Sequence, residues 1–285
     1  MAEMAAAIER GTDGGFVLDV HPESRLGPDP QMFADVQKGA LEFYLSGATL
    51  GGVAPSSALP MMPFAFKSSQ SVFAALDGEL GDVIRGELMR SGLFAFRHSL
   101  QNGFHHITTS NRPINAASDF AGLKIRTPGG AIASDFFQTL RAEPGMVPFS
   151  GMYEALKTRQ FDGQSDPHQV VVALKLNEVQ TYLNITSHWW SGFTLLVHAA
   201  AWTALPADIR WVTERNVENY AKRQRADVER INAEGEKVLA ERGMVVNHAD
   251  AGSIRGKLGS FYTRWKAKFP PATWRQLEAH ADGLG

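Results

Sequence analysis

The sequence predicts an α/β protein of two domains, each with a mainly parallel sheet, that face one another across a cleft. Three observations support this fold class. Strand-like and helix-like segments alternate near the N-terminus, which is typical of parallel βα units. A weak internal repeat relates residues 32–42 to residues 152–162. A helical pattern that starts at Pro206 is too long for one small domain.

The first expected elements are a helix over residues 1–10 and a strand over residues 16–20. A second helix over residues 31–38, ended by Gly39, is followed by a strand over residues 41–45. This order of elements favours parallel pairing of the strands.

The internal repeat is a short amphipathic helix that runs into a strand. Residues 32–42 contain Met-Phe, Val and Leu-Glu at the spacing at which residues 152–162 contain Met-Tyr, Leu and Phe-Asp. The match is either a duplication or a coincidence between two βα units. A duplication would produce two similar domains with a ligand site in the cleft between them.

A strand over residues 123–126 is expected to end at the Pro-Gly-Gly sequence of residues 128–130, and apolar residues at helical spacing follow over residues 132–140. Arg126 would therefore lie at the end of a strand and face a glycine-bordered helix start. Its guanidinium can hold two oxygens of a carboxylate or phosphate, and nearby backbone N–H groups add positive charge. A surface or structural role is the alternative for Arg126.

The longest helical pattern runs from Pro206 to about Gly243 with an intermittent apolar face. At about 1.5 Å per residue such a helix would be roughly 55 Å long. We therefore expect it to span both domains, with a bend at Gly235.

The composition excludes several classes of function. A net charge of −2 provides no basic stripe for nucleic acid, so we expect no nucleic-acid partner. No apolar run approaches the roughly 18 residues that a membrane span needs. The chain has no cysteine, which removes disulfides, thiolate metal sites and cysteine nucleophiles. Its first residues have no basic segment followed by an apolar core, so a signal peptide is absent from the chain as given.

Catalytic and cofactor motifs are also missing. The sequence contains no Gly-x-Ser-x-Gly elbow, no phosphate-binding loop, no dinucleotide fingerprint and no His-Glu-x-x-His, so we expect neither an enzyme nor a cofactor. His105, His106, Asp166 and His168 could in principle form a metal site. This leaves a small metal-dependent hydrolase as an alternative function.

Four segments in register resemble the solute-binding proteins of tripartite ATP-independent periplasmic (TRAP) transporters. They are Thr-Thr-Ser-Asn-Arg-Pro-Ile over residues 108–114, Asp-Phe-Ala-Gly-Leu-Lys-Ile-Arg-Thr-Pro over residues 119–128, Phe-Asp-Gly-Gln-Ser-Asp-Pro over residues 161–167, and Asn-Glu-Val-Gln-Thr-Tyr-Leu over residues 177–183, followed by His188. The resemblance extends from near residue 1 to about residue 245.

This resemblance implies a periplasmic-binding-protein-like fold with a long helix spanning both domains. The domains would comprise residues 1–103 with 192–233, and residues 104–191 with 234–285. The protein would be a periplasmic monomer that captures an organic acid and delivers it to the membrane components of a TRAP transporter. Family members begin with a strand that is missing here, which indicates a truncated or late-assigned start. A ligand sensor without a transporter is the other alternative.

The resemblance also implies roles for individual residues. Arg126 would ion-pair with the ligand carboxylate, and Phe149 would pack its ring on the ligand. Phe66, or its neighbour Phe64, would face the cleft from the first domain. Phe149 could equally belong to the core.

Two positions depart from the pattern of the family. His105 stands where an arginine that helps to grip the acid is common, and Asp166 stands where asparagine is common. Asp166 would accept a hydrogen bond from a ligand hydroxyl or amino group or from His105, bind a bridging cation, or cap the helix that starts at Pro167. A half-buried strand histidine without a ligand role is the alternative for His105.

Trp189 and Trp190 follow His188 near the expected domain crossover and form either an aromatic wall of the cleft or part of the core. With His105 and Asp166 in place of Arg and Asn, the ligand should be less anionic than a dicarboxylate. A hydroxylated or aromatic monocarboxylate is the ligand class that the sequence favours.

Overall fold

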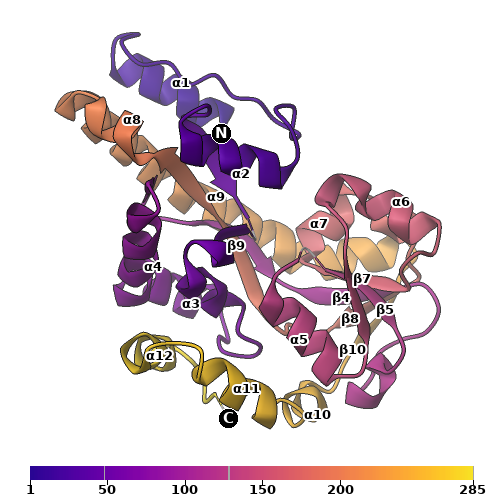
Figure 1. Ribbon diagram of the computed structural model, residues 1–285. Coiled ribbons are helices and arrows are strands. Elements are labelled where there is room, and N and C mark those ends of the chain that lie inside the picture. Colours follow the sequence, from indigo (N-terminus) through magenta and orange to yellow (C-terminus); the bar gives the residue numbers. More distant parts are fainter. Residues whose placement is uncertain (48, 128, 285) are drawn as a thin grey trace.

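The computed structural model describes residues 1–47, 49–127 and 129–284, and it is built around two β-sheets (Figure 1). Pro128, the expected end of a strand, lies outside the described residues. The strands are β1 (Phe43–Ser46), β2 (Leu93–Ala95), β3 (Leu100–Phe104), β4 (His106–Thr109), β5 (Lys124–Thr127), β6 (Glu143–Met146), β7 (Gly163–Asp166), β8 (Tyr182–Ile185), β9 (Trp190–His198) and β10 (Val245–His248).

Helices cover the two sheets and join them. They are α1 (Ala2–Gly11), α2 (Asp29–Lys38), α3 (Ser69–Leu76), α4 (Glu79–Arg90), α5 (Ala131–Thr139), α6 (Met152–Lys157), α7 (His168–Ala173), α8 (Ala199–Ala204), α9 (Ala207–Glu241), α10 (Ala251–Arg255), α11 (Gly259–Lys266) and α12 (Pro271–Glu278). The predicted helices over residues 1–10, 31–38 and 132–140 are confirmed as α1, α2 and α5. Gly39 ends α2 with a φ of 75°, a left-handed conformation that glycine adopts at little cost.

In the first sheet, β9 is the central strand and pairs antiparallel with β1, β2 and β3. The prediction of a mainly parallel sheet is therefore wrong for the described part of this sheet. The physical reason is that β1 and β2, which do run in the same direction, do not pair with each other. Each of them is hydrogen-bonded to one edge of β9 instead. This strand comes much later in the sequence and runs in the opposite direction.

The predicted strand over residues 16–20 is also absent from the structure. Residues 17–20 have no regular secondary structure, and Val17 and Val20 are exposed. A strand is stable only beside another strand that satisfies its backbone groups, and among the described residues no strand pairs with this segment. Local β-propensity was therefore not sufficient.

The second sheet has the strand order β10-β8-β4-β7-β5-β6. The pairs β10–β8, β5–β7 and β5–β6 are parallel, whereas β4 is antiparallel to both of its neighbours. The mainly parallel character predicted from the sequence is confirmed for this sheet. Parallel pairing brings the C-terminal ends of β5 and β7 to the same edge, which places Arg126 and Asp166 near each other.

Two of the places where the chain crosses between the sheets lie next to each other. One crossover joins β3 to β4 at His105, and the other joins β8 to β9 over residues 186–189. The His105 N–H donates to the carbonyl of Trp189 at 2.8 Å, so the two crossovers lie side by side. They form a two-stranded connection beneath the space between the sheets.

The predicted long helix is confirmed as α9, which contacts α1 and β3 on one side and α7 and β10 on the other (Figure 1). It is assigned as one continuous α-helix through Gly235, where we expected a bend. Gly235 serves close packing instead: a Cβ atom there would lie 2.3 Å from the Cβ of His168 on α7. None of the described helices, α9 included, is both long and apolar enough to cross a membrane.

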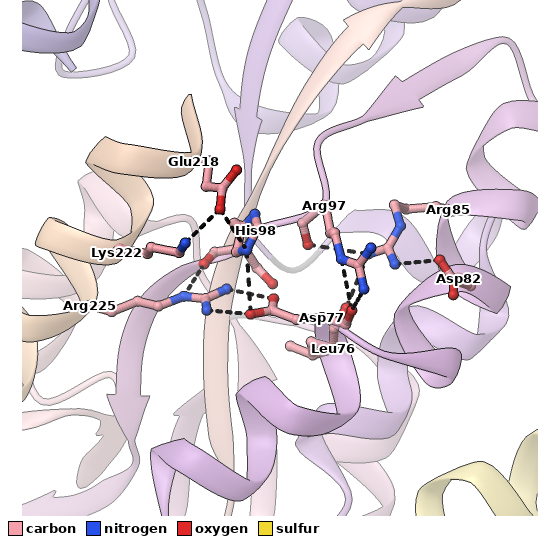
Figure 2. A network of polar contacts seen from close by, with 10 residues as sticks. Leu76, Asp77, Asp82, Arg85, Arg97, His98, Glu218, Lys222 and Arg225 are labelled. Carbon is pink, nitrogen blue, oxygen red and sulfur yellow. Dashed lines mark hydrogen bonds and ion pairs between the residues drawn. The ribbon is translucent and has the colours of Figure 1, made fainter. Parts of the chain in front are cut away.

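A polar network fastens α9 to the first sheet and its helices. Figure 2 shows the Asp77 carboxylate, at the end of α3, accepting two hydrogen bonds from Arg225 on α9 at 2.7 and 2.8 Å. The Arg225 Nε also donates to the carbonyl of Ser99, and Arg97 donates to the carbonyl of Asp77. A bidentate pair of this kind fixes geometry as well as charge. The C-terminal helices complete the packing, because α12 contacts α4 and α11 contacts α5.

The close approach of α9 and α7 leads to a first prediction. Gly→Ala in a helix interior normally stabilises by about 0.5–1 kcal/mol, but at Gly235 the added methyl group overlaps His168, and overpacking costs about 1–3 kcal/mol. Gly235→Ala should therefore lower the free energy of unfolding in urea. Gly86→Ala is the matched control, because a Cβ at Gly86 of α4 would come no closer than 3.6 Å to Arg90, and it should be stabilising. Stabilisation by both substitutions would contradict this packing.

Candidate functional site

A cavity of about 590 Å³ lies between the two sheets, a size typical of small-molecule sites. Its lining includes Leu45 of β1, Ala95 of β2 and Trp190 of β9 from the first sheet. Arg126 of β5 and Asp166 of β7 line it from the second sheet. The cavity therefore needs both sheets to be complete, as the sequence predicts for a cleft between two domains.

Arg126 is the principal cation of the second-sheet wall. It lies at the end of β5 with only 2% of its surface exposed, next to Ile125, which points into the core. Its Nε donates to the carbonyl of Val147 at 3.0 Å, and its Nη1 donates to the Asp166 carboxylate at 3.0 Å. Nη2 has no acceptor among the residues that the structure describes, so its N–H groups are available for a ligand.

Asp166 pairs with Arg126 and not with His105, one of the partners that we expected. Its carboxylate accepts from Arg126, whereas His105 bonds to two serines. The capping role is also wrong for the described residues, because Pro167 is the N-cap residue of α7 and no side-chain cap bond is present there. The sequence could not reveal this pair, since it joins residues 40 positions apart.

The electrostatics of the pair are set by burial. Burial raises the pKa of Asp166 to about 7, although the positive charge of Arg126 acts in the opposite direction. Burial also lowers the pKa of Arg126, against the favourable charge of Asp166, but arginine stays protonated because its usual pKa is so high. The cavity thus contains a permanent cation beside a carboxyl group that titrates near neutral pH.

His105 lines the same cavity but adds no second cation. It is buried, and burial lowers its pKa to about 3, so that the imidazole is neutral at physiological pH. Its Nδ1 is 3.0 Å from the hydroxyl of Ser165, and its Nε2 is 2.7 Å from the hydroxyl of Ser191. The alternative of a half-buried histidine is wrong, because His105 is fully buried and both of its ring nitrogens are hydrogen-bonded.

The aromatic candidates fall into two groups. Phe149, which is 50% exposed, and Trp190 both line the cavity, and Met146 adds a further exposed apolar side chain to the same wall. Trp189 lies in the core, with its ring centroid 5.1 Å from that of Phe136, which is the core alternative stated for it. Phe66 lines a smaller cavity of about 230 Å³ together with Phe64.

The residues of the alternative metal site do not converge. His106 stacks on His168 with 4.2 Å between ring centroids, and the Nδ1 of His168 bonds to the carbonyl of Asn232. Asp166 faces Arg126 instead. Among the described residues, no group of three or more His, Cys, Asp or Glu side chains is arranged to hold a metal ion. The metal-dependent hydrolase therefore has no support.

Several polar residues of the cavity were missed from the sequence. Asn102, Gln169 and Ser191 line it and are joined by hydrogen bonds, with the Asn102 Nδ2 donating to Ser191 at 3.0 Å and Gln169 donating to the side chain of Asn102 at 2.8 Å. The only available signal was position, since Asn102 and Ser191 flank the crossovers that contain His105 and Trp189. Ordinary polar residues of this kind carry no motif of their own.

Comparison with known proteins identifies the family. The model of the bacterial extracellular solute-binding proteins, family 7, matches residues 1–268. The chain therefore belongs to this family, and the resemblance to TRAP solute-binding proteins is confirmed.

Two similar proteins are named as periplasmic binding proteins for organic acids. The chain is 30% identical over 204 residues to the 2,3-diketo-L-gulonate-binding periplasmic protein YiaO of Escherichia coli K12, over 71% of this chain and 62% of the relative. It is 30% identical over 217 residues to the C4-dicarboxylate-binding periplasmic protein DctP of Rhodobacter capsulatus, over 75% of this chain and 64% of the relative. The matched region thus spans less than two thirds of each relative's length.

A solved structure agrees with the fold throughout. The crystal structure of a TRAP periplasmic solute-binding protein from Polaromonas sp. JS666, bound to D-erythronate, superposes with a TM-score of 0.93 at 27% identity. The match covers 99% of this chain and 93% of that chain. It confirms the periplasmic-binding-protein-like fold predicted from the sequence.

The raised pKa of Asp166 leads to a prediction about stability. An unfolded chain releases the proton of this group near pH 4, whereas the folded protein holds it up to about pH 7. The contribution to stability is therefore complete below about pH 4 and is lost as the pH rises toward 7. Asp166→Asn removes this titration, so its free energy of unfolding relative to the unmodified protein should rise from pH 5 to pH 7. Urea unfolding at both values tests this, with the exposed Asp82→Asn as control; a constant difference would contradict it.

Proposed function

We propose that this protein is an extracytoplasmic solute-binding protein that captures an organic acid in the cavity between its sheets. The observation that carries the proposal is the buried Arg126, held at the cavity wall by Val147 and Asp166 with one guanidinium nitrogen left for a ligand. A guanidinium fixed in this way suits a carboxylate, because Nη2 can donate a charge-assisted hydrogen bond to a ligand oxygen and the group stays positively charged.

The ligand is a monocarboxylate that carries hydroxyl or carbonyl groups. Asp166 already offsets part of the charge of Arg126, and His105 is neutral, so the part of the wall around Arg126 is poorly suited to a second carboxylate. Phe149 provides an apolar surface for the carbon skeleton, and Trp190 lines the opposite wall. The names of two of the similar proteins, with 2,3-diketo-L-gulonate and D-erythronate, support oxygenated acids of this class, whereas the DctP relative is named for C4-dicarboxylates.

Capture involves closure of two domains. We place residues 1–103 and 192–233 in one domain and residues 104–191 and 234–285 in the other. The crossovers at His105 and residues 186–189 act as the hinge, together with α9. The exposed Phe149 is available to become covered when the walls approach, which would supply contacts made only in the closed state.

The loaded protein delivers the acid to the membrane components of a TRAP transporter. The family consists of extracellular solute-binding proteins, and relatives are named as periplasmic, which supports a periplasmic location for this chain. We propose that the protein acts as a monomer, has no catalytic activity and binds no nucleic acid.

Arg126→Ala should abolish measurable binding of D-erythronate while the protein remains folded. Loss of a buried charged partner costs about 2–5 kcal/mol, or about 30- to 4,000-fold in affinity. Arg126→Lys should restore only part of the affinity, because an ammonium group cannot fork. Calorimetry measures the affinities, and Arg230→Ala, an exposed site on α9, is the control. An unchanged affinity of Arg126→Ala would exclude the proposed role.

Binding of a carboxylate should weaken as the pH rises from 6 to 8.5. A second carboxylate beside Arg126 raises the pKa of Asp166 further, so binding takes up a proton, and above the free pKa of about 7 the affinity should fall by up to about tenfold per pH unit. Asp166→Asn should bind D-erythronate independently of pH in this range. Calorimetry in two buffers of different ionisation enthalpy would detect the proton directly. Equal affinity of the unmodified protein at both pH values would contradict this coupling.

A further inference from the structure

A continuous hydrogen-bonded chain of side chains runs through the two crossovers to the cavity. Thr186 Oγ1 lies 2.7 Å from His188 Nδ1, and His188 Nε2 lies 3.0 Å from Ser165 Oγ. Ser165 Oγ lies 3.0 Å from His105 Nδ1, and His105 Nε2 lies 2.7 Å from Ser191 Oγ. All four ring nitrogens are therefore paired with hydroxyl groups, and the chain ends at Ser191 in the cavity wall.

Both imidazoles are neutral, so each has one donor and one acceptor nitrogen. Burial lowers the pKa of His105 and of His188. A hydroxyl can accept two hydrogen bonds, but if Ser165 accepted from both imidazoles, its own proton would be buried without an acceptor among the described residues, because the two ring nitrogens are the partners of its Oγ and its side chain is buried. The hydrogen bonds on its two sides therefore point the same way along the chain. Only two orders are possible, and they leave Ser191 in opposite roles toward the cavity.

The orientation at the cavity end is fixed by a backbone group. Gln169 Nε2 donates to the backbone carbonyl of Asn102 at 2.8 Å, which identifies it as the nitrogen of that amide. The same nitrogen is 2.8 Å from Asn102 Oδ1, so the Asn102 Nδ2 must face Ser191, where it donates at 3.0 Å. Ser191 thus always accepts from Asn102, and only the direction of its own proton remains to be set.

The far end of the chain sets that direction. If Thr186 donates to His188, its proton is used in a bond of 2.7 Å. In the reverse order Thr186 accepts from His188, and the acceptor that the structure offers for its proton is the carbonyl of His105, at 3.5 Å. Hydroxyl hydrogen bonds are normally about 2.7–2.8 Å long, so the first order is favoured.

We propose that Ser191 is a ligand-binding hydrogen-bond donor, oriented by the chain Thr186 → His188 → Ser165 → His105 → Ser191. In this order Ser191 accepts hydrogen bonds from His105 and Asn102, and its own O–H group points into the cavity. The ligand atom it recognises is an acceptor oxygen, a hydroxyl or carbonyl oxygen on the carbon skeleton of the acid held by Arg126. His105 and His188 are positioning residues, and this assignment of the ligand atom rests on the proposed function.

The direction of the chain can be tested without any ligand. Proton-detected spectra of protein labelled with ¹⁵N-histidine distinguish the two tautomers of a neutral imidazole, with assignment from single His→Gln variants. His105 and His188 should both carry the proton on Nε2. His168 is an internal control with the opposite tautomer, because its Nδ1 faces the carbonyl of Asn232 at 2.9 Å. An Nδ1 proton on His105 or His188, or a charged ring at pH 7, would overturn the proposal.

The role of Ser191 is tested with two acids of equal chain length, D-erythronate and butanoate. Ser191→Ala should lower the affinity for D-erythronate about 2- to 13-fold, the range expected for one neutral hydrogen bond. The affinity for butanoate should not change. Ser91→Ala, at the end of α4, is the matched control, with no change for either acid. Full retention of D-erythronate affinity by Ser191→Ala, or equal losses for both acids, would refute the donor role.

Substitutions of Thr186, at the far end of the hydrogen-bonded chain, distinguish an effect on the orientation of Ser191 from an effect on packing. Thr186→Val preserves the shape of the side chain but removes the first donor of the chain, so it should lower the affinity for D-erythronate. In the double variant with Ser191→Ala, the loss of affinity should be no larger than with Ser191→Ala alone. Thr186→Ser should restore binding, while the buried Thr213→Val on α9 controls for loss of a threonine hydroxyl. Additive losses would overturn the relay. If the unmodified protein bound no organic acid, the proposed function would fail, whereas the tautomers would still decide the direction of the chain.

Discussion

The buried pair of Arg126 and Asp166 is the interaction on which the rest of the site depends. A guanidinium with 2% exposure is costly unless its donors are occupied, and a buried carboxylate is costly unless it has a donor. Each group offsets the cost of the other while the cavity holds no ligand. The parallel pairing of β5 with β7 makes the pair possible, because it brings the ends of both strands to one edge.

The charge of Arg126 also helps to keep His105 neutral. His105 lies in the wall that contains Arg126, and after burial itself the charge of Arg126 is among the causes that lower the pKa of His105. A second cation there would repel the first, whereas a neutral imidazole can pass a hydrogen bond to Ser191. The part of the wall around Arg126 and His105 therefore contains one permanent positive charge, and its remaining polarity comes from groups whose direction is set by their neighbours.

Local patterns predicted the elements that local sequence determines. The helices α2, α5 and α9, the strand β5 and the position of Arg126 in the cavity wall all follow from periodicity and from glycine or proline signals. The antiparallel β9, the unpaired residues 17–20 and the partner of Asp166 could not be predicted in this way, since each depends on contacts between residues far apart in sequence. Trp189 and Phe66 show the same limit: their residue type indicates burial but does not decide between core and cavity.

In the proposed binding site, we expect hydrogen bonds to contribute more to selectivity than net charge does. Arg85 and Arg97 also line the cavity, but their guanidinium groups donate to Asp82 and to backbone carbonyls of Leu76 and Asp77, which uses much of their donor capacity. Of these two arginines, Arg85 pairs with a carboxylate, whereas Arg97 donates to a backbone carbonyl, which does not neutralise its charge. A site built around oriented polar groups rejects an analogue that lacks the matching oxygen, because a buried donor is then left unpaired. An acid with oxygens along its skeleton satisfies these donors, and a plain alkyl acid leaves them unsatisfied.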